Sequence, residues 1–180
     1  MKKILILLSL LLLLASCEEV IYPEPQPPRV KALKEIPDHL RGVYLDENQD
    51  TLVILRRSFI YHVFSFTDAS EEFLSDSLVL KSYKGKYFLS TIMDIGDENY
   101  WLTYLFEQDE STGNIEAYTM SPDDVVKMAM LQDITSKVAE MGSGDEKYYL
   151  FAPKKRHYKK IIRDTVFSKV ATFTRIIPGE

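Results

Sequence analysis

The residue types that usually carry catalysis or bind metals are few in this sequence, and they do not cluster along the chain. Its 180 residues include one cysteine and three histidines, and His39, His62 and His157 form no pair that would place two metal ligands on one helix face. No Gly-x-Ser-x-Gly nucleophile motif occurs, and the seven glycines form no phosphate-binding loop. We therefore expect neither an enzyme nor a site for a metal or cofactor.

One acidic segment imitates the beginning of a calcium-binding loop. Its alternate residues Asp46, Asn48 and Asp50 are of the ligand type. The glycine expected next is replaced by Thr51, and the bidentate glutamate expected at the twelfth position is replaced by Arg57. The pattern fails where the geometry is strictest, so a solvated hairpin loop is the favoured interpretation.

A basic stretch near the C-terminus carries six positive charges within ten residues, 154–163. The whole chain has a formal net charge of -5, from 22 basic and 27 acidic residues, which argues against a nucleic-acid-binding surface. At a membrane each such charge would contribute about 1 kcal/mol of attraction to anionic head groups, and a solvated face that balances local acids is the alternative. The charges that helical spacing would place on one outer face are Lys155, Arg156, Lys159, Lys160 and Arg163.

The first sixteen residues predict a signal for export. Lys2 and Lys3 precede a twelve-residue apolar run, Ile4–Ala15, which is interrupted only by Ser9. As a helix this run would span about 18 Å, well short of the roughly 30 Å hydrocarbon core of a bilayer. Its length and flanks are typical of a secretory signal peptide, residues 1–16, that is removed from the mature protein.

The only cysteine follows this apolar run directly. Leu14-Ala15-Ser16-Cys17 resembles the lipobox of bacterial lipoproteins, in which small residues precede the cysteine at the cleavage site. The resemblance implies cleavage between Ser16 and Cys17, a diacylglycerol thioether on Cys17 and an acyl group on its new amine. Several acyl chains on one residue anchor a protein stably, so we expect attachment to a membrane through Cys17. The mature chain keeps 20 basic and 27 acidic residues, a formal net charge of -7.

Glu18 and Glu19 follow the cysteine, and this acidic pair resembles the surface-export signal of Bacteroidota lipoproteins. In lipoproteins of well-studied Gram-negative bacteria an aspartate at the first of these positions signals retention at the inner membrane, and this chain has Glu18 there. The resemblance implies a cell-envelope protein of the outer membrane. The sequence is compatible with either leaflet of that membrane, the periplasmic or the external one.

Residues 17–35 predict a lipidated, proline-rich tether. Four prolines lie between positions 23 and 28, and proline fixes φ and lacks an N–H donor, which favours extended polyproline II over a packed element. Such a tether could hold the domain up to about 60 Å from the lipid, at about 3.1 Å per residue. Residues 36–180 would then form a single globular domain rich in β-structure.

From residue 36 onward the pattern is mostly that of strands. Seven segments rich in aromatic and β-branched residues are separated by polar or glycine-containing breaks, about one strand every ten residues. This spacing predicts an antiparallel meander that forms a curled sheet or a small barrel. The predicted strands are 41–45, 51–56, 58–66, 77–83, 86–93, 100–107 and 114–119.

One or two helices are predicted in the C-terminal half, so the expected fold class is α+β, mainly β. Ser121 and Pro122 are typical of a helix start, and apolar residues recur every four positions from there, which predicts an amphipathic helix that ends at Gly142. The segments predicted after it are a strand at 148–152, a second short helix at 153–163 and a last strand at 165–177.

The start of the meander, Leu40-Arg41-Gly42-Val43-Tyr44, resembles the first strand of lipocalin-like domains in small bacterial lipoproteins. Those domains place a glycine and an aromatic residue on the first strand of a barrel. True lipocalins have Gly-x-Trp, and this chain has Tyr44 in place of the tryptophan. The resemblance implies a barrel, while a curled sheet with helices over one end fits equally well.

Three short patterns resemble the Asp-Ser/Thr-apolar sequon of O-glycosylation in Bacteroidota. They are Asp-Thr-Leu, Asp-Ser-Leu and Asp-Thr-Val, which begin at positions 50, 76 and 164. The resemblance is consistent with a Bacteroidota origin and makes Thr51, Ser77 and Thr165 candidate O-glycosylation sites.

The leading functional hypothesis is a non-enzymatic, lipid-anchored envelope domain that binds a small apolar ligand or another envelope component. Aromatic residues make up 12% of the chain, and its eleven tyrosines could line a pocket or a contact surface. One alternative is an accessory subunit of an envelope protein complex, docked through the basic stretch 154–163. The other is a hydrolase of envelope polymers, with paired carboxylates among Asp94, Asp97 and Glu98.

Overall fold

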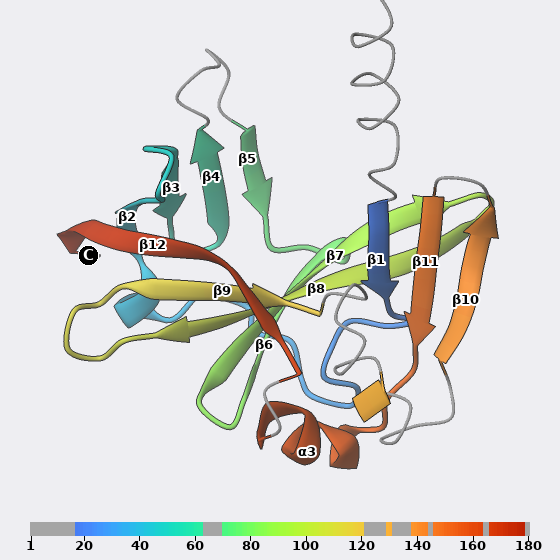
Figure 1. Cartoon of the computed structure of the whole chain (residues 1–180). Helices are drawn as coiled ribbons and strands as arrows, with labels where there is room; N and C mark the ends of the chain where they lie inside the picture. Colours follow the sequence, from blue (N-terminus) through green and yellow to red (C-terminus); the bar gives the residue numbers. More distant parts are fainter. Residues whose placement is uncertain are drawn as a thin grey trace, which may run out of the picture.

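Nine strands form one antiparallel sheet that curls into a nearly closed barrel (Figure 1). The computed structural model describes residues 17–62, 70–120, 129–130, 138–143, 146–163 and 166–178. The strands of this sheet are β2 (Gly42–Leu45), β3 (Thr51–Ile54), β4 (Ser58–His62), β5 (Ser70–Phe73), β6 (Leu78–Tyr83), β7 (Lys86–Ile95), β8 (Glu98–Gln108), β9 (Ile115–Thr119) and β12 (Ser168–Pro178). Their order is β5-β4-β3-β2-β12-β9-β8-β7-β6, and the predicted α+β fold class is confirmed.

The last strand, β12, joins the two meanders β2–β5 and β6–β9. It pairs antiparallel with β2 on one side and with β9 on the other, so the last strand predicted at 165–177 is confirmed and lies in the middle of the sheet. Its ladders are interrupted by two bulges, after Lys169 and after Arg175, which let one strand bend around both meanders. The extra residues at these bulges, Val170 and Ile176, are 53% and 50% exposed.

The barrel interior is filled by side chains that alternate along the strands. On β3, Leu52 and Ile54 are buried while the residues between and before them are only partly buried, as expected for a strand with one face in the core. Tyr44 of β2 is fully buried, and its hydroxyl donates to the backbone carbonyl of Leu40 at 2.8 Å. The other members of this cluster are Ile36, Leu40, Phe59, Leu74, Leu78, Leu80 and Ile115.

Tight turns reverse the chain where the sequence has polar or glycine residues. At the β6–β7 hairpin, Lys84 and Gly85 have φ of 58° and 76°, the two positive values that a type I′ turn requires. Glycine adopts such values without strain, and the twist of this turn matches that of the strands it joins. The predicted strand breaks therefore coincide with hairpins.

A second sheet of three strands begins at Cys17 and lies beside the barrel. Its strands, in order, are β1 (Cys17–Ile21), β11 (Glu146–Phe151) and β10 (Val138–Ser143). β1 runs parallel to β11, with Cys17 opposite Glu146. The next residue, Tyr22, exchanges two backbone hydrogen bonds with Trp101 of β8, each 2.9 Å long, and so ties this sheet to the barrel.

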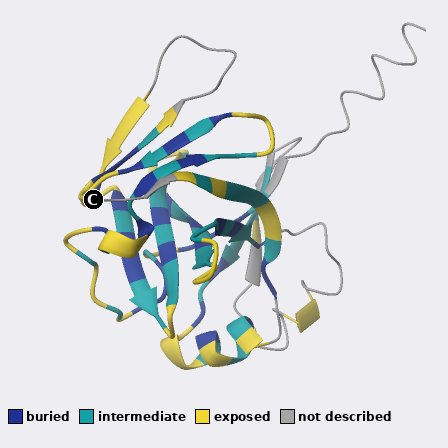
Figure 2. Cartoon of the chain, turned by 90° about the vertical axis from the view of Figure 1, so that its left-hand side faces the viewer, coloured by how far each residue is buried: buried dark blue, intermediate teal, exposed yellow. Residues whose placement is uncertain are grey.

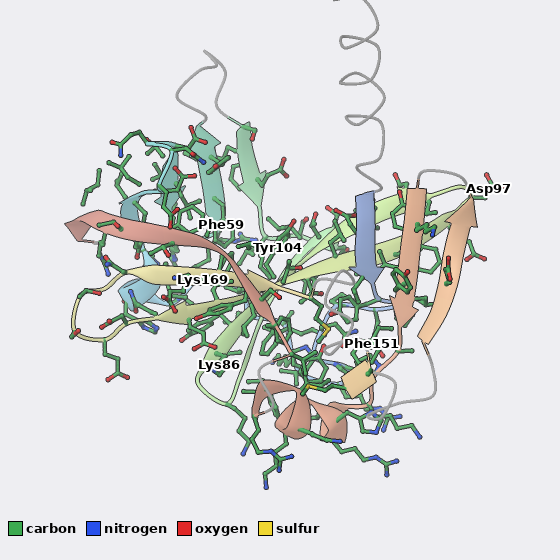
Figure 3. All side chains as sticks on the ribbon, in the orientation of Figure 1. Phe59, Lys86, Asp97, Tyr104, Phe151 and Lys169 are labelled. Atoms are coloured by element: carbon green, nitrogen blue, oxygen red, sulfur yellow. The ribbon has the colours of Figure 1, made fainter. Side chains whose placement is uncertain are left out.

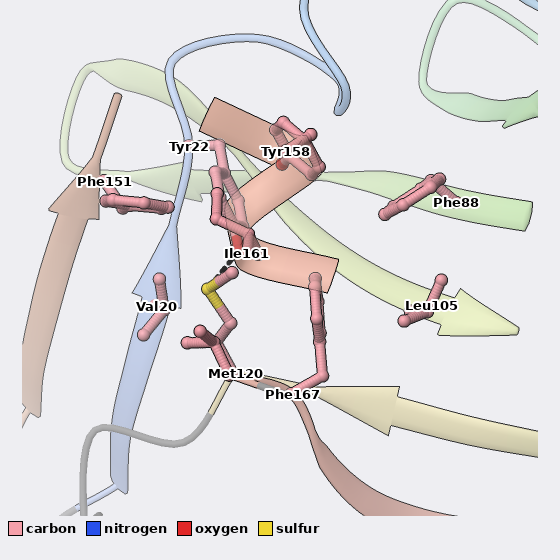
Figure 4. Close-up of a cluster of buried hydrophobic side chains, with 10 residues drawn as sticks. Val20, Tyr22, Phe88, Leu105, Met120, Phe151, Tyr158, Ile161 and Phe167 are labelled. Atoms are coloured by element: carbon pink, nitrogen blue, oxygen red, sulfur yellow. Dashed lines mark hydrogen bonds between the residues drawn. The ribbon is translucent and has the colours of Figure 1, made fainter. Parts of the chain in front are cut away.

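A second apolar cluster joins β1 and β11 to the barrel and to α3 (Tyr158–Arg163) (Figure 4). Tyr22 lies within it, and its hydroxyl donates to the sulfur of Met120 at 3.1 Å. The ring of Tyr22 makes an edge contact with Phe151 of β11, with 6.0 Å between ring centroids. Full burial of such side chains stabilises a fold by roughly 1.5–3 kcal/mol each, so β1 belongs to the core.

The proline-rich residues that follow Tyr22 are packed against the barrel, so the prediction of an extended tether over 17–35 is wrong. Gln26 is 1% exposed, and the two prolines after it are also buried. The ammonium group of Lys81 on β6 donates to the carbonyls of Pro25 and Pro27, at 2.6 and 3.1 Å. Prolines lack N–H donors, but their carbonyls can still accept hydrogen bonds. Donors on β6 therefore hold in place a segment that local preferences alone would leave extended.

Buried polar groups hold Gln26 in place from three elements. Its backbone N–H donates to Ser90 Oγ at 3.0 Å, and Ser90 Oγ lies 2.9 Å from Thr103 Oγ1. The Tyr158 hydroxyl donates to Gln26 Oε1 at 2.7 Å, and Gln26 Nε2 donates to the Glu24 carbonyl at 2.6 Å. Because these buried groups satisfy one another, the described folded unit begins at Cys17, and the predicted boundary at residue 36 is wrong.

Residues 32–36, which we call the strap, cross the seam between the two edges of the barrel. The edges are β5 and β6, which follow one another in sequence but are not neighbours in the sheet. The N–H of Leu33 donates to the Leu80 carbonyl on β6, and the N–H of Ile36 donates to the Arg56 carbonyl after β3, both at 2.8 Å. The strap therefore connects two parts of the barrel that strand pairing leaves apart.

The helical predictions have mixed outcomes. The helix expected from Ser121 lies largely outside the described residues; residues 129 and 130 are helical, but β10 occupies the last turn of the predicted helix, so that part is wrong. A short helical segment at 153–163 is confirmed as the 3-10 turn η3 (Lys155–His157) followed by α3. A further 3-10 turn, η2 (Asp38–Leu40), precedes β2. The sequence pattern did not indicate β1, β5 or β10.

Candidate functional site

The positive charges identified in the sequence gather at one end of the molecule. Basic side chains project from η3 and α3, and their nitrogen atoms crowd the lower end of the view in Figure 3. All of them are exposed except one, which is partly buried. We call this region the basic surface, and its members are Lys154, Lys155, Arg156, Lys159, Lys160 (the partly buried one) and Arg163.

Two apolar side chains on the inner face of α3 fix the basic surface to the fold. Tyr158 and Ile161 lie three residues apart, on the same side of the helix, and both are fully buried. The ring of Tyr158 makes an edge-to-face contact with Phe88 of β7, with 5.5 Å between ring centroids. Figure 2 shows the result, a helix with a buried inner side and exposed residues along its outer side.

The β6–β7 hairpin extends the positive charge of this end. The Lys155 ammonium lies 5.8 Å from the centroid of the Tyr83 ring, within cation–π distance. Lys84 is exposed in the hairpin turn, whereas Lys86 is paired with Glu107. The basic surface therefore continues from α3 onto a second element of the fold.

Several of these charges form no ion pair with a described side chain. Lys155, Arg156 and Lys159 form no ion pair with any side chain in the part of the chain that the structure describes. The interpretation of a face that merely balances local acids is therefore not supported for these three side chains. Their charges are available to an external anionic group.

His157 adds no positive charge to the basic surface at neutral pH. Burial, together with the charges of Arg156 and Lys154, lowers the pKa of its imidazole below the usual value of 6.5. Its Nδ1 accepts a hydrogen bond from the Lys154 N–H at 3.2 Å, which favours the neutral ring. The charge of the surface therefore rests on its lysine and arginine side chains.

Cys17, where the sequence predicts lipid attachment, lies at a different end of the molecule from the basic surface. In Figure 1, β1 begins in the upper part of the molecule and runs down, while α3 lies at the bottom. Ser16, on the other side of the expected cleavage site, is outside the described residues. Among the described residues no helix is both long and apolar enough to cross a membrane. A lipid on Cys17 would be joined directly to a paired strand of the folded domain.

The carboxylates considered for a hydrolase lie at the turn between β7 and β8. Asp94, Asp97 and Glu98 are all exposed, and Gly96, with φ of 62°, completes the turn. Glu98 accepts a hydrogen bond from the hydroxyl of Tyr100. A protruding turn does not place two carboxylates across a substrate cleft, so this geometry does not support the hydrolase alternative.

The acidic loop between β2 and β3 is organised by its own hydrogen bonds. Asp46 Oδ1 accepts from the N–H groups of Asn48 and Asp50, at 2.8 and 2.9 Å. The Tyr61 hydroxyl donates to the carboxylates of Asp46 and Asp50, both at 3.2 Å, and burial with these two charges raises the pKa of Tyr61 to about 12. In the part of the chain that the structure describes, no three His, Cys, Asp or Glu side chains are grouped as metal ligands.

The three candidate O-glycosylation sites occupy different settings. Thr51 is the first residue of β3 and is partly buried. Ser77 is exposed in the turn between β5 and β6, and its hydroxyl lies 2.9 Å from that of Ser75. Thr165 lies outside the described residues. Of the two that are described, Ser77 is the more accessible.

A cleft of about 400 Å³ opens at the seam of the barrel, and no local sequence pattern indicates it. We call it the seam cleft; its walls come from the strap, the turn after β3, the β5–β6 turn and the start of β6. Its apolar residues have the sequence pattern of ordinary core positions, and the strap supplies part of its wall. The lining residues that matter below are Leu33, Lys34, Arg57, Leu74, Leu78 and Val79.

Comparison of the chain with protein-family models, with curated proteins and with solved structures finds no match. The features of this chain that bear on its function are the basic surface, the seam cleft and the position of Cys17.

Proposed function

We propose that this chain is a non-enzymatic, lipid-anchored domain of the cell envelope that binds an acidic protein partner through the basic surface. The observation that carries the proposal is the placement of the basic surface, which lies at the lower end in Figure 1, away from the start of β1 at Cys17. A domain anchored at Cys17 would hold these charges away from its own membrane.

Anchoring at Cys17 is supported by the sequence before it. An apolar run too short to span a bilayer ends in Leu14-Ala15-Ser16-Cys17, which resembles a lipobox, and Glu18 with Glu19 favours the outer membrane. The parallel pairing of β1 with β11 also bears on the geometry, because it leaves no spacer between the lipid and the fold. The anchored domain would lie close to the bilayer, without the reach of about 60 Å that a free tether of residues 17–35 would give.

The chemistry of the partner follows from the charge of the surface. Lys155, Arg156 and Lys159 are exposed and have no described ion-pair partner, so an acidic protein face would complement them. Both proteins would be confined to the envelope, and confinement raises the effective concentration of one for the other. An interface of modest affinity therefore suffices, which fits an accessory subunit of an envelope complex.

The bilayer that holds the lipid is a less suitable partner for the same charges. Basic residues contribute to membrane binding only within about a Debye length of the head groups, roughly 8–10 Å. In Figure 1 the basic surface lies at the lower end of the molecule, whereas β1 begins in its upper part. We therefore assign it to a protein partner that approaches from the side opposite to the anchor.

Charge reversal tests this assignment. The variant Lys155→Glu/Lys159→Glu alters two exposed side chains and leaves the buried face of α3 intact. We expect it to lose the partner in gentle co-purification from the native envelope, because attraction is replaced by repulsion, with affinity at least tenfold lower. Recovery of the wild-type complex should also fall as salt is raised.

The matched control is Lys31→Glu/Lys34→Glu, which makes the same change in net charge on exposed residues of the N-terminal segment. It should retain the partner. Equal recovery of a companion protein by the wild type and Lys155→Glu/Lys159→Glu would reject the basic surface as the docking site, and loss in both variants would indicate a general charge effect. Retention of an anionic polysaccharide in place of a protein would also overturn the proposal.

A further inference from the structure

The seam cleft has the size and position of a small-molecule site. Its volume of about 400 Å³ is within the range of roughly 300–1,000 Å³ that is usual for such sites. It lies where the barrel edges β5 and β6 are not paired, and the strap crosses it between the bonds at Leu33 and Ile36. The barrel interior is filled by side chains, so the cleft offers a ligand a place at the edge of the core.

One wall of the seam cleft is apolar and continuous with the core. Leu74 and Leu78 are each 9% exposed and belong to the cluster that fills the barrel. Leu33 of the strap and Val79 of β6 are partly buried beside them. A small apolar group in the cleft would remove these four side chains from water without displacing any of them.

The rim of the seam cleft carries positive charge. Arg57 and Lys34 are exposed and line the cleft, and neither forms an ion pair with another described residue. The third charged lining residue, Glu35, is bonded to Arg56 at 2.6 Å, so its charge is already paired. The planar guanidinium of an arginine matches a carboxylate with two parallel hydrogen bonds.

We infer that the seam cleft binds a small carboxylate with an apolar body, such as a medium-chain fatty acid. The apolar part contacts Leu33, Leu74 and Val79, and the carboxylate meets Arg57 at the rim, with Lys34 adding to the attraction. This site is separate from the basic surface, and the inference goes beyond the docking of a protein partner. The chain would then combine a protein-binding surface with a site for an amphiphilic anion.

Titration with octanoate tests the inference. Calorimetry on residues 17–180 carrying Cys17→Ser, which keeps every other described residue and avoids lipid and detergent, should give saturable binding of one octanoate per chain. Arg57→Gln should weaken it about tenfold or more, because a charge-assisted hydrogen bond is lost. Val79→Asp should weaken it as well, since it places a negative charge in the apolar wall. Octanol, which has the same chain without the charge, should bind at least tenfold more weakly.

The control variant is Lys31→Gln, which removes an exposed positive charge from the same segment without lining the cleft. It should bind octanoate within about twofold of the wild type. Amide chemical shifts that change at Leu33 and Val79 would locate the ligand independently of affinity. No saturable binding at millimolar octanoate, or equal affinity in Arg57→Gln, would overturn the inference. Lys155→Glu/Lys159→Glu should bind octanoate with wild-type affinity. A failure of the octanoate site can therefore be distinguished from a failure of the proposed docking of a protein partner.

Discussion

The ammonium group of Lys81 lies 2.6 Å from the backbone carbonyl of Pro25, 56 positions earlier in the chain. Lys81 is only 7% exposed, and burial lowers the pKa of its amine. A buried lysine is costly unless its donors are satisfied, and here the carbonyl of Pro27 accepts a second bond at 3.1 Å. The contact fastens the proline-rich segment to β6 and makes the N-terminal residues part of the fold.

The first prediction concerns this contact. Lys81→Met should lower the free energy of unfolding by about 1–3 kcal/mol, because it leaves the carbonyls of Pro25 and Pro27 without a donor in a buried site. Urea denaturation measures the change. The control variant Lys31→Met replaces an exposed lysine of the N-terminal segment, and its free energy of unfolding should stay within about 0.5 kcal/mol of the wild type. A Lys81→Met variant as stable as the wild type would show that these two bonds do not fasten the proline-rich segment to β6.

The second prediction concerns pH. Burial raises the pKa of the Tyr158 and Tyr22 phenols above the ordinary value of 10. Above pH 10 the unfolded chain loses these protons and the folded chain keeps them. The contribution of the two phenols to the free energy of unfolding is therefore fully present below pH 10 and falls as the pH rises above it. Each such group contributes a slope of about 1.4 kcal/mol per pH unit.

The variant Tyr158→Phe isolates one of these groups. It should be less stable than the wild type at pH 7, since Gln26 Oε1 loses its donor, and the gap should narrow above pH 10 because the variant has one titrating phenol fewer. Denaturant midpoints measured from pH 7 to pH 11 give both curves. A gap that stays constant over this range would show that the Tyr158 phenol titrates alike in the folded and unfolded chain.

The third prediction concerns the height of the domain above the membrane. If lipid on Cys17 joins β1 directly, a fluorophore on Asp97→Cys should transfer energy to acceptor-labelled lipid more efficiently than one on Lys155→Cys. The turn that holds Asp97 is level with the start of β1 in Figure 3, whereas α3, which directly follows the η3 turn that holds Lys155, lies at the lower end in Figure 1. Lipidated protein in vesicles provides the measurement. Equal and weak transfer from both positions is the result expected of a long flexible tether.

The fourth prediction concerns modification. Protein from the native host should carry hexose-containing mass increments at Thr51, Ser77 or Thr165, and the exposed Ser77 is the first to examine. Ser77→Ala should remove one increment from the intact mass. Ser75→Ala, two residues away and outside the pattern, should leave the mass of the glycan unchanged. A lipidated chain with no added sugar in the wild type would contradict this prediction.

The strands were predictable because their signals are local. Hairpins such as Lys84-Gly85 and the alternation of Leu52 and Ile54 are visible within ten residues of sequence. The N-terminal segment was misjudged because the same local approach gave weight to its prolines. Val20, Ile21 and Tyr22 are three consecutive strand-forming residues, and they could have indicated β1.

The candidate sites divide in the same way. The basic surface was predictable because its charges are neighbours in sequence and share the outer side of one helical segment. The seam cleft was not predictable, because it depends on the strap meeting Leu80 and Arg56, residues far from it in the chain. The distance between the basic surface and Cys17 was not predictable either, because it depends on how β1 pairs with β11, which no local pattern specifies.

The most direct test of the proposed function is native mass spectrometry of the protein extracted gently from its own envelope. We expect residues 17–180 with a lipid increment on Cys17, together with one stoichiometric protein companion of acidic composition. The same measurement on Lys155→Glu/Lys159→Glu should give the lipidated chain without the companion. A wild-type chain that carries lipid but no companion, or a companion that remains bound to the variant, would contradict docking through the basic surface.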